Sequence, residues 1–334
     1  MPDSQLTAAV LIATYNRPDH LQTCLDHLDQ QTVAPDAIVI VDSSPDDRSA
    51  EVAQRHGGIT YLRNPLGRGH TATSRRMGLE AAGDVDIIVF IDDDAFARPN
   101  WLEELLRRYD DPSVAGVGGR ADNGQPGEES VGLDAIGQFL PDGTLTGNFA
   151  ADPGADVRVD HLLGANMSLR VAAVRAVGGI EDHYPGTCLR EESEIALRLR
   201  LAGYRIVYTP AALVRHVGGT YAKGRRFDAR YTYYGQRNHI VLLARVLGPR
   251  DPRFHRYLRV AVGKVGGDVG YAARALRRGR LRGEESVISG VGRGLINAAS
   301  TTGGIATGLS LVLTGRVPQA RTAPRVPTPS ITRA

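Results

Sequence analysis

The sequence predicts an α/β protein with a Rossmann-like, mostly parallel sheet flanked by helices and followed by a C-terminal helical appendage. Three short apolar runs, at residues 8–14, 37–41 and 87–91, support this class. Each is typical of a buried strand and each is followed by polar residues. Apolar residues at helical spacing follow the first run, at Leu21, Cys24, Leu25 and Leu28. Sheets of this class bind ligands at the carboxyl ends of their strands.

The first two predicted strands end in polar residues that suit a planar base. The first ends in the segment Thr14-Tyr15-Asn16-Arg17 and the second continues into Asp42. A base needs a donor and an acceptor held edge-on, and Asp42 with the Thr14 loop supplies both. Each residue alone is explained equally well as a helix cap or turn residue. Their gathering at one sheet edge favours a binding site.

Three consecutive carboxylates, Asp92 to Asp94, follow the third predicted strand. Such a cluster repels itself unless a cation neutralises it, and oxygen ligands of this kind suit Mg²⁺ or Mn²⁺. An ion held by one or two carboxylates usually completes its shell with substrate phosphates. The triplet therefore predicts a metal site and a phosphate-bearing substrate. The alternative is an acidic turn that caps the helix starting near residues 99–100.

Further ionisable residues occur later in the chain. Glu191, Glu192 and Glu194 begin a helical pattern, where carboxylates also complement the helix dipole. His216 follows two β-like segments, residues 205–208 and 211–214, and a strand-end histidine of this kind is by itself more often structural than functional. The next loop, residues 218–226, suits either closure over a diphosphate or a solvated surface, because it contains Lys223, Arg225 and Arg226.

Together these segments resemble the family 2 inverting glycosyltransferases, which have the GT-A nucleotide-diphosphosugar fold. The resemblance extends over about residues 7–240 and follows the family's order of motifs. It also includes residues 64–69, 164–168, 190–198 and 214–216. One departure lies in the segment Ser74-Arg75-Arg76-Met77-Gly78, where Arg76 stands in place of the family's usual asparagine.

The resemblance implies a role for each matching residue. A nucleotide diphosphosugar of the UDP, dTDP or GDP type would bind through Thr14, Tyr15, Asn16, Arg17, Asp42, Arg68, Asp92 and Asp93. A Mg²⁺ or Mn²⁺ ion would bind to Asp94, His216 and Asp92. The sugar and acceptor would contact Gly164, Ala165, Asn166 and Glu191. Glu192 takes the position of the catalytic base, usually aspartate in the family, with Glu191 as the fallback and Glu194 as a support.

Sugar transfer makes two chemical demands. The ion would absorb negative charge on the leaving diphosphate. A carboxylate opposite the leaving group would remove the acceptor's hydroxyl proton, which is typically worth about 10² to 10⁴ in rate. One base on that face gives single displacement with inversion. The sequence therefore predicts a metal-dependent, inverting, hexosyltransferase-like enzyme whose acceptor is a glycan, a lipid-linked molecule or a secondary metabolite.

Other classes fit parts of the sequence. A sugar nucleotidyltransferase would show a glycine-rich loop with a lysine after the first strand, and a dinucleotide-binding enzyme would show G-x-G there. A nucleic-acid binder would use the tyrosines and arginines of residues 230–237. That segment also resembles a glycosyltransferase helix, so no nucleic-acid partner is expected. A noncatalytic nucleotide-sugar-binding scaffold would not need the carboxylates, Glu192 and His216 together.

Charge is divided unevenly along the chain of 334 residues, whose net charge is +3. Residues 223–334 contain 21 Lys and Arg against 5 Asp and Glu, giving +16 and leaving −13 for residues 1–222. We therefore expect residues 1–120 to form the nucleotide-sugar-binding half and 121–240 the acceptor and catalytic half of one GT-A domain. Residues 241–317 would form a basic helical appendage and 318–334 a disordered tail.

The appendage has two distinct segments. Residues 254–281 are typical of a helix, with arginines at 274, 277, 278, 280 and 282 in and just beyond it, whereas residues 294–315 carry no charge. The uncharged span is long enough to cross a bilayer, but its polar residues and glycines disfavour insertion. Docking on an anionic membrane surface, or packing as a domain helix, is expected instead.

Cysteine usage and the first residues bear on location. Cys24 and Cys188 lie far apart, so no disulfide framework is expected. The N-terminal segment has Asp3 and no basic leader, and its apolar run already forms the first strand. These features predict a cytoplasmic protein, and the appendage adds the expectation of peripheral attachment to the inner face of the cell membrane. The oligomeric state is left open.

Overall fold

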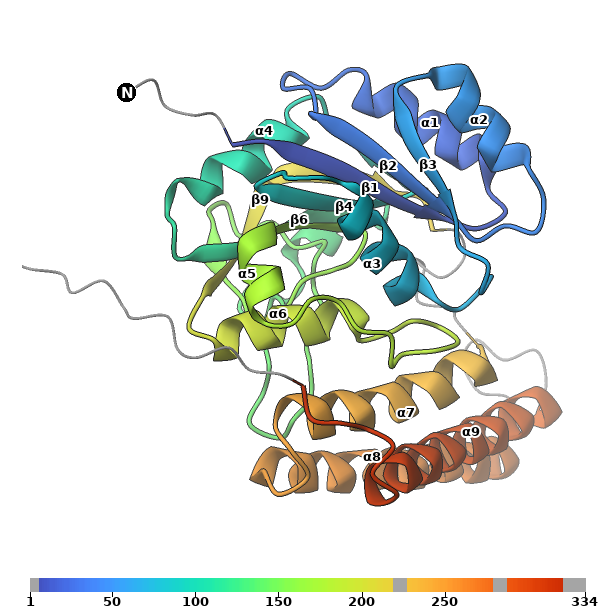
Figure 1. The fold of residues 1–334 in the computed structure, drawn as a ribbon. Coiled ribbons are helices and arrows are strands. Elements are labelled where there is room, and N and C mark those ends of the chain that lie inside the picture. Colours follow the sequence, from blue (N-terminus) through green and yellow to red (C-terminus); the bar gives the residue numbers. More distant parts are fainter. Residues whose placement is uncertain (1–5, 219–226, 279–286, 321–334) are drawn as a thin grey trace, which may run out of the picture.

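The structure is a computed structural model that describes residues 6–218, 227–278 and 287–320 (Figure 1). Several sequence predictions concern residues outside these ranges. They are the closing loop with Lys223, Arg225 and Arg226, the arginines at 280 and 282, and residues 321–334 of the predicted tail.

One nine-stranded mixed sheet forms the centre of the molecule. Its strands are β1 (Ala8–Thr14), β2 (Ala37–Asp42), β3 (Ile59–Arg63), β4 (Ile87–Asp92), β5 (Ala95–Ala97), β6 (Val114–Asp122), β7 (Val157–Arg158), β8 (Asn166–Arg170) and β9 (Arg205–His216). They lie in the order β3-β2-β1-β4-β8-β6-β9-β5, and β7 pairs with β9. Strands β1 to β4 pair in parallel, whereas β8, β5 and β7 pair antiparallel with their neighbours.

Helices cover both faces of this sheet (Figure 1). One face carries α1 (Pro18–Leu28), α2 (Arg48–His56) and α4 (Trp101–Leu106), and the other carries α3 (Thr71–Ala81), α5 (Val171–Ala176) and α6 (Glu191–Leu201). Short 3₁₀ turns occupy Arg107–Asp110 and Glu128–Ser130. Because side chains alternate along a strand, Val10 packs with the α1 core and Leu11 with the α3 core. Gly78 lets α3 approach Leu11 closely, since a Cβ there would overlap that side chain.

The predicted α/β class with a C-terminal helical appendage is confirmed. The three predicted strands are β1, β2 and β4, the last two each one residue longer than expected. The two β-like segments before His216 form the single strand β9. Parallel pairs join strands β1 to β4 with one another and also β6 with β9, while the antiparallel pairs of β8, β5 and β7 make the sheet mixed.

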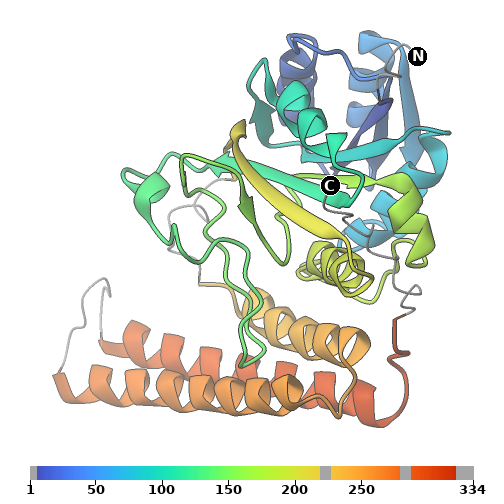
Figure 2. The same cartoon turned by 90° about the vertical axis from the view of Figure 1, so that its left-hand side faces the viewer.

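Three long helices form a layer beside the sheet domain (Figures 1 and 2). They are α7 (Ala229–Val246), α8 (Pro252–Arg278) and α9 (Val287–Leu313). Glycines of α9 allow close packing, because Gly308 lies against Ile240 of α7 and Gly294 against Ala272 of α8. The boundary expected between residues 240 and 241 falls inside α7.

A buried ionic network attaches α7 to the sheet domain. The guanidinium of Arg245 forms two hydrogen bonds of 2.9 Å with Glu194 of α6 and also pairs with Glu181 at 3.0 Å. Tyr184 donates a further hydrogen bond to Glu194, and Arg198 lies 3.3 Å from the same carboxylate. Glu194 was expected to support the catalytic base. In the structure its carboxylate links α6 to α7 through Arg245.

The described part of the chain contains one helix, α9, that is long and apolar enough to cross a membrane, with a mean hydropathy of 1.2 over 18 residues. A single helix of this kind is only a weak indication of a membrane span. About 22% of that window is buried, through the small residues that face α7 and α8. The opposite face of α9 is exposed.

Candidate active site

A cluster of three metal-ligating side chains forms where β4 ends beside β9. The antiparallel pairing of β5 with β9 sets Ala95 opposite His216, and the amide of Val217 donates to the carbonyl of Asp94 at 2.9 Å. This pairing brings His216 Nε2 to 3.4 Å from Asp94 Oδ1. Ligand atoms of Asp92, Asp94 and His216 all lie within 4.8 Å of one another.

The donor set fits a divalent metal ion. Two carboxylates and one imidazole suit Mg²⁺ or Mn²⁺, with the nitrogen favouring the latter. His216 Nδ1 donates to the side-chain oxygen of Asn123 at 3.3 Å, which leaves Nε2 facing Asp94. An outer partner of this kind fixes the tautomer and orientation of a metal-binding histidine. Asn123 was not predicted, because nothing local marks it.

Arg17 forms ion pairs with two of the three consecutive carboxylates, and Thr14 donates a hydrogen bond to one of them. Arg17 pairs with Asp93 at 3.1 Å and with Asp94 at 2.6 Å, while Thr14 donates to Asp93 at 2.7 Å. Burial, followed by the charge of Asp94, raises the pKa of Asp93 to about 7. Burial acts upward on Asp94 as well, but its contacts with His216 and Arg17 outweigh burial and lower its pKa. Asp94 is thus the carboxylate most firmly held in its ionised form.

A buried arginine links the metal-ligating cluster to the acidic first turn of α6. Arg75 of α3 forms an ion pair with Glu191 and lies 3.6 Å from Asp92. It also donates to the carbonyl of Gly164 at 2.9 Å. A Cβ on Gly164 would lie 2.5 Å from Arg75 Nη2, so only glycine leaves room for the guanidinium. Arg75 lies in the segment 74–78, where the sequence departs from the family pattern, and it was not predicted as a site residue.

Glu191 and Glu192 have different surroundings. Glu191 is 5% exposed and its carboxylate is bound by Arg75. Glu192 is half-buried, and in the described part of the chain it has no ion-pairing partner. Burial raises the pKa of both carboxyls, whereas the charge of Arg75 acts in the opposite direction. Of the two, Glu192 has the carboxylate free to accept a proton.

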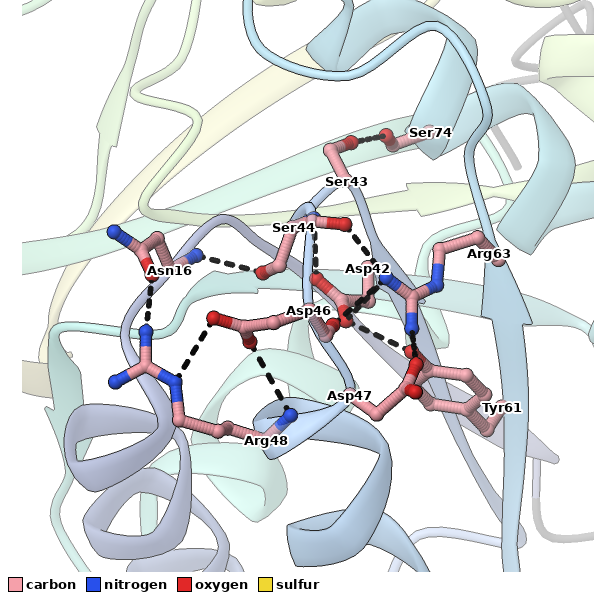
Figure 3. Close-up of polar contacts among 10 residues, drawn as sticks. All are labelled: Asn16, Asp42, Ser43, Ser44, Asp46, Asp47, Arg48, Tyr61, Arg63 and Ser74. Atoms are coloured by element: carbon pink, nitrogen blue, oxygen red, sulfur yellow. Dashed lines mark hydrogen bonds and ion pairs between the residues drawn. The ribbon is translucent and has the colours of Figure 1, made fainter.

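The predicted nucleotide residues divide into an exposed and a buried group. Tyr15 is exposed, and the guanidinium of Arg68 lies 5.9 Å from its ring centroid. This pair offers a planar, positively charged surface suited to a base or a phosphate. Asn16 adopts a left-handed backbone with φ of 55°, and its amide donates to Ser44 Oγ at 2.7 Å (Figure 3). Arg48 donates to the Asn16 side chain.

Asp42 is shown among its hydrogen-bonding partners in Figure 3. It is fully buried, and its carboxylate accepts hydrogen bonds from the hydroxyl of Tyr61 at 2.8 Å and from the amide of Ser44 at 2.7 Å. Arg63 lies 3.9 Å away. In this arrangement Asp42 holds the segment after β2, through the amide of Ser44. The sequence predicted that Asp42 contacts a base, and in this structure its side chain is not exposed.

The predicted sugar and acceptor residues are also mostly internal. Gly164 and Ala165 are buried. Asn166 donates both amide hydrogens, to the carbonyls of Arg120 and Ala212 at 2.9 Å each, and accepts from Trp101 Nε1 at 2.8 Å. Its side chain therefore has no donor free for a sugar and braces β6, β8 and β9. These polar contacts between distant segments could not be predicted from local sequence.

Comparison with known proteins shows which family this chain is similar to. Residues 9–169 match the family model described as glycosyl transferase family 2. The match lies within the region that the sequence motifs had indicated.

Individual relatives agree with this assignment. The chain is 30% identical over 190 residues to the O-antigen chain rhamnosyltransferase WbaN of Salmonella anatum, covering 56% of this chain and 58% of that protein. It is 32% identical over 200 residues to the pre-mycofactocin glycosyltransferase of Mycobacterium tuberculosis, covering 59% of this chain and 40% of that protein. The chain thus spans about half the length of these curated relatives.

A solved structure supports the fold. The mannosyltransferase PcManGT of Pyrobaculum calidifontis, in complex with GDP-Man and Mn²⁺, is similar with a TM-score of 0.57 and 16% sequence identity. The similarity covers 94% of this chain and 89% of that one. At this identity the likeness bears on the fold alone.

Proposed function

We propose that this protein is a metal-dependent, inverting glycosyltransferase that moves a sugar from a nucleotide diphosphosugar to an acceptor hydroxyl. The observation that supports it best is the grouping of Asp92, Asp94 and His216 within 4.8 Å at the strand ends, linked through Arg75 to the first turn of α6. The family match and the named activities of the relatives point to the same reaction class.

The residues divide the reaction between them. A Mg²⁺ or Mn²⁺ ion bound by Asp92, Asp94 and His216 would neutralise charge on the leaving diphosphate. Tyr15 and Arg68 would hold the nucleotide, and Arg17 and Asp93 would adjust the charge near its phosphates. Glu192 would accept the proton of the attacking hydroxyl, while Arg75 keeps Glu191 fixed beside it. Attack opposite the leaving group inverts the anomeric carbon.

Donor type is tested by thermal unfolding with Mn²⁺ and UDP, dTDP or GDP in turn. A ligand that binds only the native state raises the unfolding free energy by about 2.7 kcal/mol at a hundredfold excess over Kd, and so raises the melting temperature. One nucleotide should stabilise the wild type clearly, and Asp94→Ala should lose that effect. Equal stabilisation of Asp94→Ala, or full transfer activity in EDTA, would contradict the metal assignment.

The base is tested by two matched amide substitutions. Glu192→Gln retains shape but cannot accept a proton, so turnover should fall by about 10² to 10⁴ while donor affinity stays within a few fold. Glu191→Gln should lower turnover less than Glu192→Gln does. The reverse ranking would make Glu191 the base. Product NMR should show the inverted anomer, and a retained configuration would exclude single displacement.

We also propose that the helical layer formed by α7, α8 and α9 binds to the anionic inner face of the cell membrane. On α9, Ile288 is 84% exposed and Leu313 83% exposed, and Arg293 is the one charged residue in the helix. On α8, exposed Val262, Val269 and Leu276 recur every seven residues and so share one face. Exposed arginines accompany them on α8, namely Arg256, Arg259, Arg274 and Arg277. Apolar contact with nearby cations suits interfacial binding.

This membrane proposal is tested by co-sedimentation with vesicles. The protein should sediment with phosphatidylglycerol vesicles at low salt, release at high salt, and ignore phosphatidylcholine vesicles. Ile288→Ser and Leu276→Ser should weaken binding, and both sites are exposed enough to leave folding intact. Wild-type binding by the doubly substituted protein would refute the assignment of this face.

A further inference from the structure

A small pocket with two cations in its lining lies between the sheet domain and the helical layer, away from the metal-ligating cluster. Its volume is about 200 Å³, which suits one chemical group of a ligand rather than a whole small molecule. It lies where the loop carrying Thr144 meets α7 and α8, and its lining includes Arg190, His239, Tyr257 and Lys264. No acidic residue lines it.

Among described residues, the two cations of this pocket, Arg190 and Lys264, have no ion-paired carboxylate, although the charge of Arg190 acts on neighbouring Glu192. A larger cavity nearby, of about 330 Å³, provides the contrast. Its Arg200 pairs with Asp160 at 2.7 Å and its Arg253 with Asp251 at 2.8 Å. Two of the three arginines that line the larger cavity are thus paired with carboxylates, whereas in the described structure neither cation of the smaller pocket is.

Two buried polar atoms at this pocket lack a hydrogen-bond partner in the described structure, namely Arg190 Nε and His239 Nδ1. His239 is 1% exposed, and its Nε2 donates to the carbonyl of Gly143 at 2.7 Å, so Nδ1 is left as an acceptor. Buried polar groups without partners are costly, and in native proteins such groups often mark a ligand or water site.

The backbone of Arg190 is also held in an unusual conformation. Its φ is 85°, in the left-handed region that non-glycine residues seldom adopt. Arg190 is the N-cap of α6 and directly precedes Glu191 and Glu192. A group bound by Arg190 would therefore lie next to the turn that carries the proposed base, on the side facing the helical layer.

We propose that this pocket binds a phosphate group carried by the acceptor, through Arg190 and Lys264, while His239 Nδ1 accepts a hydrogen bond from a neighbouring hydroxyl. The assignment rests on the proposed glycosyltransferase function and specifies its acceptor as a phosphate ester. Tyr257, whose ring centroid lies 4.1 Å from that of His239, supplies a flat apolar wall. The donor phosphates belong to the metal-ligating cluster and are not the ligand of this pocket.

The test measures binding of octyl phosphate to the full-length protein by calorimetry in EDTA, so that metal-dependent donor binding does not contribute. Lys264→Gln should raise Kd about tenfold or more, because it removes one charge-assisted contact. Arg190→Asn should do the same, since asparagine tolerates the left-handed backbone. The matched control Arg259→Gln removes an exposed α8 cation outside the pocket and should bind as the wild type does.

Three outcomes decide the proposal. Unchanged Kd in both Lys264→Gln and Arg190→Asn would overturn it. Loss of octyl phosphate binding in Asp94→Ala would overturn it too, because the ligand would then occupy the donor site. Competition by inorganic phosphate, with no competition by octyl glucoside, would support recognition of the phosphate.

Two further measurements distinguish the acceptor pocket from a lipid-headgroup site and from the donor site. With phosphatidylglycerol vesicles, Lys264→Gln should lose no more binding than Arg259→Gln. A selective loss of vesicle binding with octyl phosphate binding retained would assign the cation to lipid headgroups and overturn the acceptor site. Nucleotide-dependent stabilisation with Mn²⁺ is read separately on the same variants, so failure of the donor assignment is distinguishable from failure of this pocket.

Discussion

Replacement of Arg75 by methionine is the sharpest test of how the site is held together. The side chains of Arg75 and Glu191 are each 4% exposed, so their ion pair is almost fully removed from water. Arg75→Met retains much of the volume but leaves Glu191 buried without its cation. Removing one partner of a buried pair costs about 3 to 5 kcal/mol of unfolding free energy. Loss of the contacts to Asp92 and the Gly164 carbonyl acts in the same direction.

A double-mutant cycle with Glu191→Gln isolates the pair. Glu191→Gln alone should cost less than Arg75→Met, because Arg75 keeps Asp92 and Gly164 as partners. In the double variant no unpaired glutamate remains, so the two losses should be less than additive by about 1 to 3 kcal/mol. Urea titration gives these values from shifts in midpoint at constant slope.

Acidification supplies an independent readout. Without Arg75, the pKa of Glu191 should rise further above its unfolded value, so protonation is favoured in the folded state. Because burial already raises the pKa of Glu191 to about 8 beside Arg75, the penalty of Arg75→Met should shrink as the pH falls toward 8 from above. The surface control Arg107→Met breaks an exposed pair with Glu103 and should cost about 0 to 1 kcal/mol. If Arg75→Met costs no more than this control and the cycle is additive, the reasoning is refuted.

Three other predictions concern stability. Burial lowers the pKa of His161 to about 4 and that of His239 well below its usual value, so the unfolded state binds more protons than the folded state in acid. The unfolding free energy should therefore fall between about pH 6.5 and 4, by up to roughly 3 kcal/mol for His161. A urea midpoint that stays constant over this range would contradict the prediction. Gly119→Ala should destabilise by at least about 1 to 3 kcal/mol, because its Cβ would meet the Ala212 carbonyl and Asn166, whereas Gly147→Ala, with open space around it, should be near neutral by the same assay. Glu194→Gln should cost about 3 to 5 kcal/mol by breaking its contacts with Arg245 and Arg198, and limited proteolysis should then cut α7 faster than in wild type; equal rates would show that Glu194 does not couple the layers.

The sequence was sufficient for features that depend on local periodicity. The strands at residues 8–14, 37–41 and 87–91 were recognisable because apolar runs bounded by polar turns have few other solutions, and their common sheet edge followed from parallel topology. The acidic start of α6 and the order of motifs were equally visible. These features led to the fold class and to the resemblance to family 2 glycosyltransferases.

What a residue contacts depended instead on packing between distant segments. Asp94 and His216 meet because β5 pairs with β9. Packing also made Arg75 the partner of Glu191 and enclosed Asp42 and Asn166, although both were predicted to face ligands. A carboxylate or amide at a strand end looks the same in sequence whether it faces solvent or a neighbouring arginine, tyrosine or tryptophan. The sequence by itself thus determined where the polar groups gather, and only the tertiary structure decided which of them remain free to act.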